Sequence, residues 1–446
     1  MERKENLELE RNLYLPLKEA NSLEEFLQNP TSYSALNLAN TKIDEFDYLN
    51  LTLALIDTKE SGAASLTSIC LDRVNIEEKI ISAFFTALLE HTPNLISLSC
   101  SNMNLSENAI LSIAESIKTT NNQIAKLTFA NSQLSPGGAV ALVEALNCNS
   151  LTELDLSENS IGCEINKIAD KLRKCKSLSV LNLFNTGLSN DGIEYLAEWL
   201  NISGINRLHT LNLSGNLVGS GDVQALAEWL ASCDSLSVLK LANAGLIEEN
   251  VIQIAGRLVQ SNTVKLAEID LCENGMSDIS IKALAEWFSR CTVLTMVDLS
   301  HNLIGNEGAR ALAEGLAPSK DTLSMLNLAQ NRIGDSGGQA ILNLASEKLE
   351  LLFLNDNFLS ESIRNLFYEN RYDIGSQTPI YQSISTGQEK IKQEEYPTGA
   401  NQESSSSRLV RKGGWENSSW YEITEFLSGD TTALSGTDGY DSTQNE

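Results

Sequence analysis

Residues 294–316 read L-T-M-V-D-L-S-H-N-L-I-G-N-E-G-A-R-A-L-A-E-G-L, and from residue 323 the pattern starts again as L-S-M-L-N-L-A-Q-N-R-I-G-D-S-G-G-Q-A. Each copy contains L-x-x-L-x-L-x-x-N-x-Φ-G, where Φ is apolar, and the first copy continues as G-x-x-x-L-A-x-x-L. Alternating leucines predict a short strand, whereas apolar residues spaced by three and four predict a helix. Each copy therefore predicts one strand followed by one helix.

The same pattern recurs along most of the 446 residues. Successive copies begin 26 to 30 residues apart from residue 66 onward, and the first spacing is 33. Repeats of this length stack into a solenoid, so the length of the chain does not by itself indicate several domains. The twelve units begin at Tyr33, Leu66, Leu95, Ile124, Leu151, Leu178, Leu208, Leu236, Leu266, Leu294, Leu323 and Leu349.

An asparagine at the ninth position of the unit has a predicted mechanical role. Its amide can satisfy backbone groups where the chain turns out of the strand, which a buried turn requires. Thr186 and Ala244 replace it in two intervening units, and the first four units lack it. The position is held by Asn159, Asn216, Asn274, Asn302, Asn331 and Asn357.

These features resemble the leucine-rich repeats of the ribonuclease-inhibitor-like subclass over roughly residues 33–370. The resemblance rests on the quoted consensus, the unit length and the alternation of two unit types. It implies an α/β fold, a right-handed horseshoe-like solenoid with a parallel concave sheet and convex helices.

We divide the chain into three parts. Residues 1–32 form a predicted N-terminal cap, in which Ser22 and Glu25 make an S-x-x-E capping box ahead of a short helix. Residues 33–374 form the solenoid, which closes with a capping helix ending near Tyr372. Residues 375–446 are rich in Ser, Thr, Gln, Glu and Gly, and we expect a mostly disordered polar tail.

The charge of the chain bears on its partners. There are 59 acidic and 32 basic residues, a formal net charge of −27, which disfavours nucleic acid. A protein partner with a basic surface fits this charge, although acidity is also a common solubility device. We see no membrane span and no signal peptide, and we expect a cytoplasmic monomer.

The cysteines show no metal-type spacing. Cys148, Cys175, Cys233 and Cys291 each lie three residues before the first leucine of a unit. We expect them to fill one type of buried niche as reduced, small apolar side chains.

The outward positions of the strands form the predicted binding surface, since solenoids usually bind on this face. An acidic surface with apolar anchors suits a protein partner with basic hot spots, the alternative being surface charge without a role. The candidate partner-binding residues are Glu153, Asp155, Glu158, Phe184, Lys240, Glu268, Asp270, Glu273, Met296, Asp298 and Phe353.

We expect no enzyme, no cofactor and no metal site. Residues 334–338 spell G-D-S-G-G, the nucleophile signature of trypsin-like proteases, but they fill a repeat's loop and helix start, and no histidine motif accompanies them. Arg73 in D-R-V-N-I-E-E-K is loosely similar to the arginine loop of GTPase-activating proteins for Ran. That resemblance leaves a GTPase activator as an alternative, beside a stoichiometric enzyme inhibitor.

The tail carries two further patterns: R-L-V-R-K at 408–412 and W-E-N-S-S-W-Y-E-I-T-E-F-L at 415–427. The aromatic segment either folds back on the solenoid or forms a docking motif. Glu-rich stretches such as Q-E-K-I-K-Q-E-E-Y look like the signals of type IV secretion substrates. The chain could therefore be a bacterial effector acting in the host cytoplasm.

Overall fold

Every predicted repeat contributes one strand to a single parallel sheet. The computed structural model describes residues 19–61, 66–120, 123–202, 207–261 and 265–372. Each repeat strand has three residues and begins two residues after the predicted start of its unit. The strands are β2 (Ala35–Asn37), β4 (Ser68–Cys70), β6 (Ser97–Ser99), β7 (Lys126–Thr128), β8 (Glu153–Asp155), β9 (Val180–Asn182), β10 (Thr210–Asn212), β11 (Val238–Lys240), β12 (Glu268–Asp270), β13 (Met296–Asp298), β14 (Met325–Asn327) and β15 (Leu351–Phe353).

The sheet has 13 strands in sequence order, because a strand outside the repeats joins its edge. This strand, β1 (Glu19–Ala20), pairs in parallel with β2 and was not predicted. The register is constant between repeats: Ile269 of β12 lies opposite Val297 of β13, at the same position of the consensus. A separate two-stranded sheet joins β3 (Lys42–Ile43) to β5 (Asn75–Ile76).

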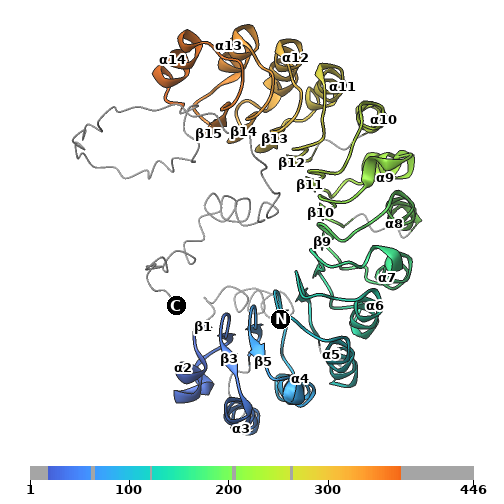
Figure 1. Cartoon of the computed structure of the whole chain (residues 1–446), viewed down its shortest axis with the longest axis vertical. Coiled ribbons are helices and arrows are strands. Elements are labelled where there is room, and N and C mark those ends of the chain that lie inside the picture. Colours follow the sequence, from blue (N-terminus) through green and yellow to red (C-terminus); the bar gives the residue numbers. More distant parts are fainter. Residues whose placement is uncertain (1–18, 62–65, 121–122, 203–206, 262–264, 373–446) are drawn as a thin grey trace, which may run out of the picture. The chain divides into compact units, whose positions relative to one another are not determined.

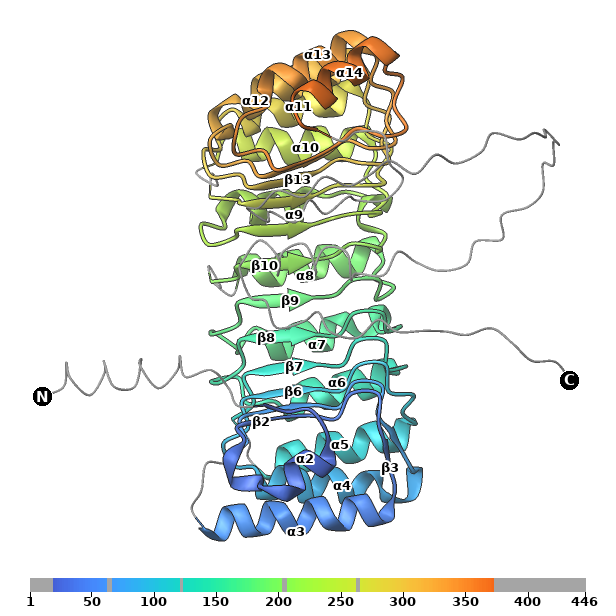
Figure 2. The same ribbon diagram turned by 90° about the vertical axis from the view of Figure 1, so that its left-hand side faces the viewer.

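Helices cover one face of the sheet. Figure 1 shows the strands in one layer and the helices in another, and Figure 2 looks onto the strand layer with the helices behind it. The helices are α2 (Leu23–Gln28), α3 (Glu45–Ser61), α4 (Glu78–His91), α5 (Glu107–Thr120), α6 (Pro136–Ala145), α7 (Ile165–Leu172), α8 (Asn190–Ile202), α9 (Gln224–Ser232), α10 (Glu248–Val259), α11 (Asp278–Phe288), α12 (Asn306–Leu316), α13 (Asp335–Leu344) and α14 (Glu361–Glu369). The consensus leucines form the core between the layers. This is the leucine-rich-repeat solenoid arrangement that the resemblance implies.

The ninth-position asparagines form a ladder that links neighbouring repeats. Asn216 is 2% exposed. Its Nδ2 donates to the carbonyls of Leu183 and Leu213, at 2.7 and 3.0 Å. Its Oδ1 accepts the N–H groups of Thr186 and Leu188, at 3.1 and 3.0 Å. The predicted role of the amide is confirmed. Because Asn216 also satisfies backbone N–H groups of the preceding repeat, Thr186 can take the place of an asparagine in that repeat.

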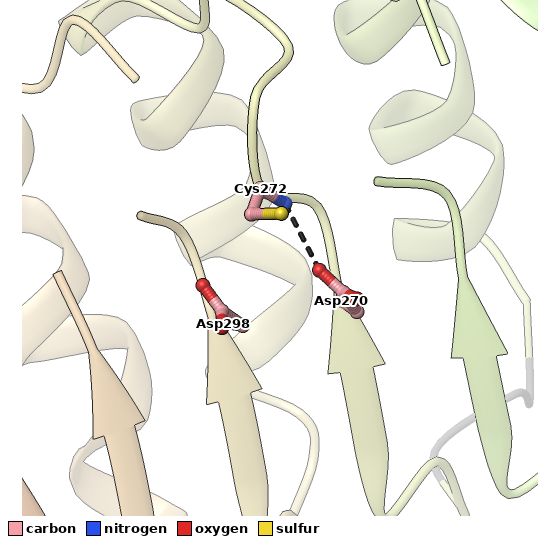
Figure 3. Close-up of side chains that lie close together, drawn as sticks. All are labelled: Asp270, Cys272 and Asp298. Carbon is pink, nitrogen blue, oxygen red and sulfur yellow. Dashed lines mark hydrogen bonds between the residues drawn. The ribbon is translucent and has the colours of Figure 1, made fainter. Parts of the chain in front are cut away.

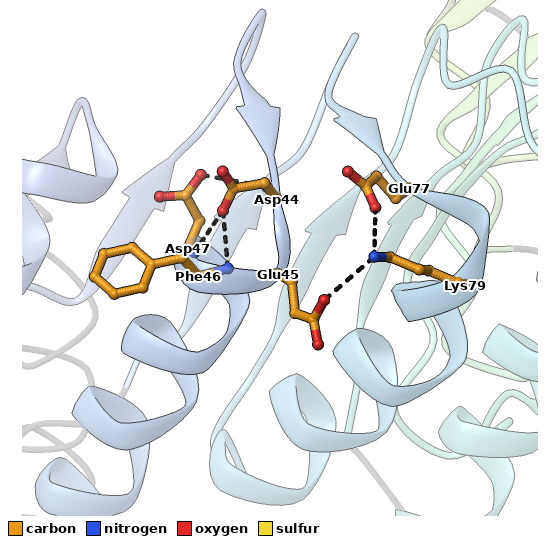
Figure 4. Close-up of polar contacts among 6 residues, drawn as sticks. All are labelled: Asp44, Glu45, Phe46, Asp47, Glu77 and Lys79. Atoms are coloured by element: carbon orange, nitrogen blue, oxygen red, sulfur yellow. Dashed lines mark hydrogen bonds and ion pairs between the residues drawn. The ribbon is translucent and has the colours of Figure 1, made fainter.

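The N-terminal end is held by helix caps and charge pairs. Ser22 accepts the N–H of Glu25 at 3.1 Å, which confirms the predicted cap of α2. Asp44 accepts the N–H of Phe46 at 2.8 Å, and Lys79 bridges Glu45 and Glu77, at 3.2 and 3.1 Å (Figure 4). The bridge links α3 to α4, in repeats that lack the ladder asparagine.

One cysteine pair departs from the expectation. Cys175, Cys233 and Cys291 are fully buried, as predicted. Cys148 and Cys175, however, form a disulfide between neighbouring repeats, with Cα atoms 4.1 Å apart. Reduced thiols were the wrong prediction for this pair, because the shared niche in consecutive repeats brings the two side chains together.

Some predictions fall outside the described residues. The disordered tail at 375–446, the segments at 408–412 and 415–427 and the secretion signal all lie there, as does most of the 1–32 cap. The helix α14 occupies the place expected for the C-terminal capping helix. In the described part of the chain, no helix combines the length and apolarity needed to cross a membrane.

Candidate partner-binding face

The outward residues of the sheet form a surface that we call the strand face. It bears the side chains of the 13-stranded sheet that point away from the helices, together with the turns in which these strands end. All eleven predicted partner-binding residues lie on it, in four groups. Glu153, Glu268 and Met296 begin strands; Asp155, Lys240, Asp270, Asp298 and Phe353 end strands; Phe184 lies two residues after a strand; Glu158 and Glu273 lie in the following turns.

The strand-ending aspartates have a structural role that the sequence reading missed. Asp155, Asp270 and Asp298 each accept the backbone N–H two residues further on, at 2.9, 3.1 and 2.9 Å. Asn182 and Asn327 do the same in their own repeats, each at 3.1 Å. Such contacts shape the turn that leaves the strand. These residues form a second ladder, which we call the strand-end ladder.

Burial separates the eleven residues. Asp270, Asp298 and Met296 are only 5%, 2% and 2% exposed. Glu273 is exposed, and the other seven residues are partly exposed. Alternation along a strand predicts which way a side chain points but not how much solvent reaches it. The surface available to a partner is therefore smaller than the predicted set.

The turn residues share a left-handed backbone. Glu158 and Glu273 have φ values of 57° and 56°, and Arg73 has 56° at the same place in its unit. The N–H of Arg73 donates to the carbonyl of Ser101 at 2.8 Å, as the N–H of Glu158 does to that of Phe184 at 2.7 Å. The conformation of Arg73 is thus a property of the repeat. It does not mark a special arginine loop.

Charges on the strand face are partly compensated. Lys126 pairs with Glu153 at 2.7 Å. Burial raises the pKa of Glu268, and the nearby charges of Lys240 and His209 act in the opposite direction. Burial also lowers the pKa of Lys240, against the attraction of Asp270 and Glu268. The acidic side chains remain in excess around β8 and β12.

Asp270 is a carboxylic acid whose pKa is strongly shifted by its surroundings. Burial and the neighbouring Asp298 carboxylate raise the pKa of Asp270 to about 7. Burial likewise raises the pKa of Asp298. The Cys272 thiol lies beside both carboxylates (Figure 3), and burial raises its pKa far above the usual range. The sequence analysis placed Asp270 and Asp298 on the binding surface and did not single out Cys272, because the contact between the three residues joins two repeats.

The G-D-S-G-G sequence at residues 334–338 forms the start of a repeat helix. Gly334 is the N-cap of α13, and Ser336 lies in the first turn of this helix. The N–H groups of Gly334 and Gly337 donate to Asn306 at 2.9 and 2.8 Å. The glycines thus provide packing between helix starts.

Comparisons with known proteins agree with the repeats. A family model described as "Leucine Rich repeat" matches residues 147–164, 174–197, 290–313 and 322–342. Ribonuclease inhibitor of Sus scrofa is 29% identical over 262 residues, covering 51% of this chain and 56% of the inhibitor. NACHT, LRR and PYD domains-containing protein 5 of Homo sapiens is 27% identical over 300 residues, covering 65% of this chain and 21% of that protein.

An internalin from Listeria monocytogenes is similar in structure, with a TM-score of 0.45 and 17% identity over 80% of this chain and 89% of its own. The chain spans between a fifth and just over half of the two relatives' lengths. Leucine-rich-repeat proteins are generally protein-interaction modules, and relatives of the ribonuclease-inhibitor type are typically binding scaffolds without enzymatic activity.

Proposed function

We propose that the strand face binds a protein partner through a basic surface of that partner. The observation that carries the proposal is a row of partly or fully exposed glutamates beside the strand-end ladder. Glu273 is exposed and Glu153, Glu158 and Glu268 are partly exposed, whereas the neighbouring Asp155 and Asp270 accept backbone N–H groups within the fold. Phe184 and Phe353, both partly exposed, supply apolar anchors of the kind found at interface centres.

The rigidity of the sheet also supports binding at the strand face. The ladder fixes the backbone beneath the glutamates, so a partner meets a preorganised surface and loses little conformational entropy from this side. Basic partners are also attracted by the net charge of −27, which raises their association rate at low salt.

The test is a comparison of two quadruple variants. Glu153→Gln, Glu158→Gln, Glu268→Gln and Glu273→Gln remove four charges from the strand face and leave the aspartates in place. The control removes the same number from the helix side, where the glutamates are exposed. Its changes are Glu194→Gln, Glu198→Gln, Glu286→Gln and Glu314→Gln.

Proteins captured by the wild-type chain are identified, purified and measured by surface plasmon resonance. We expect the face variant to bind at least tenfold more weakly and the control to bind like the wild type. Equal affinities of all three chains, or equal loss in both variants, would exclude the strand face as the site.

A second candidate is stoichiometric inhibition of an enzyme, which the similarity to a ribonuclease inhibitor favours. It requires that a captured partner be an enzyme and that its activity fall linearly to zero at one chain per enzyme. Partial inhibition at saturation would exclude this mode.

A GTPase activator with Arg73 in its active loop stays a prediction, as do monomeric state and cytoplasmic location. The effector hypothesis also stays a prediction, because its signal belongs to residues 375–446. Fusion of this segment to a reporter enzyme would test translocation.

A further inference from the structure

In two of the three repeats whose strand ends in an aspartate, the strand-end ladder follows one rule: the aspartate accepts a side-chain amide from the end of the next strand. Asp155 accepts the side-chain amide of Asn182 from the next strand at 2.8 Å. Asp298 accepts that of Asn327, again at 2.8 Å. In both repeats a side-chain amide from the next strand thus satisfies the second carboxylate oxygen.

The rule is broken at Asp270. Its Cα partner on the next strand is Asp298, so a carboxylate faces a carboxylate with no amide between them. Both side chains are at least 95% buried, with exposures of 5% and 2%. Like charges at this separation inside a protein require a proton or a cation to neutralise them.

A second part of the rule fails in the same repeat. Ser157 and Ser300 each donate a hydroxyl to the aspartate two residues before them, at 2.6 Å. The equivalent residue after Asp270 is Cys272, whose thiol is a weak donor. Asp270 accepts the Cys272 N–H on Oδ1 at 3.1 Å, and the weakly donating Cys272 thiol takes the place of the serine hydroxyl beside its carboxyl group.

The two departures bring three potential metal ligands together. One carboxylate oxygen from Asp270, one from Asp298 and the Cys272 sulfur all lie within 4.8 Å of one another. Figure 3 shows Cys272 above the ends of the two strands that carry Asp270 and Asp298. Lys240 contributes one positive charge nearby, against three carboxylates including Glu268.

We propose that Asp270, Cys272 and Asp298 form a binding site for a divalent cation of the Zn²⁺ class. A thiolate favours Zn²⁺ over Mg²⁺ and Ca²⁺, which prefer oxygen ligands alone. Three protein ligands leave one tetrahedral position for water. On binding, the Cys272 S–H bond breaks, its proton leaves to buffer, and the sulfur lone pair bonds to the ion. The site is independent of the proposed partner.

The repeat itself supplies variants that remove ligands while preserving the fold. Cys272→Ser installs the serine found in the Asp155 and Asp298 repeats. Asp270→Asn installs the side chain that ends β9 and β14. The matched control is Asp155→Asn. Asp155 accepts the Ser157 hydroxyl and the Asn182 amide, so it has both of the contacts that Asp270 lacks.

The full-length chain, freed of metal with a chelator, is titrated with Zn²⁺ by calorimetry in two buffers of different ionisation enthalpy. Co²⁺ absorption reports a thiolate ligand. We expect a site that releases a proton and shows a thiolate charge-transfer band. Cys272→Ser should abolish the band, and each ligand variant should weaken Zn²⁺ binding at least tenfold.

The control Asp155→Asn should bind Zn²⁺ like the wild type. The proposal is overturned if the wild type binds Zn²⁺ no more tightly than Cys272→Ser and Asp270→Asn, because the carboxylates would then share a proton only. Equal weakening by the control would equally refute it. Circular dichroism of each variant verifies that the fold is retained.

Discussion

Replacement of Asn216 by alanine tests the ladder that holds the repeats together. The change removes a side chain that is 2% exposed and accepts two backbone N–H groups, those of Thr186 and Leu188. It also leaves the carbonyl of Leu213 without the amide donor that it has at 3.0 Å.

A buried donor without an acceptor costs about 1–3 kcal/mol. Two such N–H groups therefore lower the free energy of unfolding by about 4 kcal/mol, if water does not enter. The lost contacts span two repeats, so we also expect a lower m-value as the array loses cooperativity.

Urea unfolding followed by circular dichroism measures both quantities. The control is Asn343→Ala in the exposed face of α13, where the asparagine accepts only from Gln339 at 3.2 Å. It should change stability by less than about 0.5 kcal/mol. A loss below about 1 kcal/mol for Asn216→Ala would refute the assigned role of the amide.

Two further predictions concern single positions. Gly219→Ala should destabilise the chain, because the new Cβ would lie 2.2 Å from the backbone oxygen of Gly245. Gly256→Ala has no heavy atom within 4 Å of the new Cβ and should stabilise α10 by about 1 kcal/mol. Thermal unfolding of both variants measures these changes, and equal effects would contradict the prediction. Asp335 accepts the N–H of Ser360 at 2.7 Å, which lowers its pKa, so its contribution to stability is present above the unfolded pKa of about 3.8 and lost as the pH falls through the folded value. Asp335→Asn should therefore be less stable than the wild type at pH 7, and the difference should shrink as the pH falls below about 3.8, whereas a constant difference would contradict the assignment.

The sequence was sufficient for the strands and the asparagine ladder, because both follow from a repeated pattern of apolar side chains and one amide. The strand positions agree even in the first four units, where Thr41 and Val74 replace the asparagine. The strand β1 escaped prediction because its two residues have no leucine pattern and are fixed only by pairing with β2.

The candidate site was predicted less completely. Outward position identified Asp155, Asp270 and Asp298 but not their hydrogen bonds within the fold. A usable signal was present, since Asp or Asn ends many strands and Ser follows two residues later in the Asp155 and Asp298 repeats. The meeting of Asp270 with Asp298 depends on register between repeats, which one repeat read alone does not contain.

The most direct test of the proposed function is the salt dependence of affinity for a purified partner. The association rate of the wild type and of the strand-face glutamine variant is measured from low to high ionic strength. The account predicts fast, salt-sensitive association for the wild type and slow, weakly salt-dependent association for the variant. Identical rates and salt dependences for the two chains would show that the partner binds elsewhere.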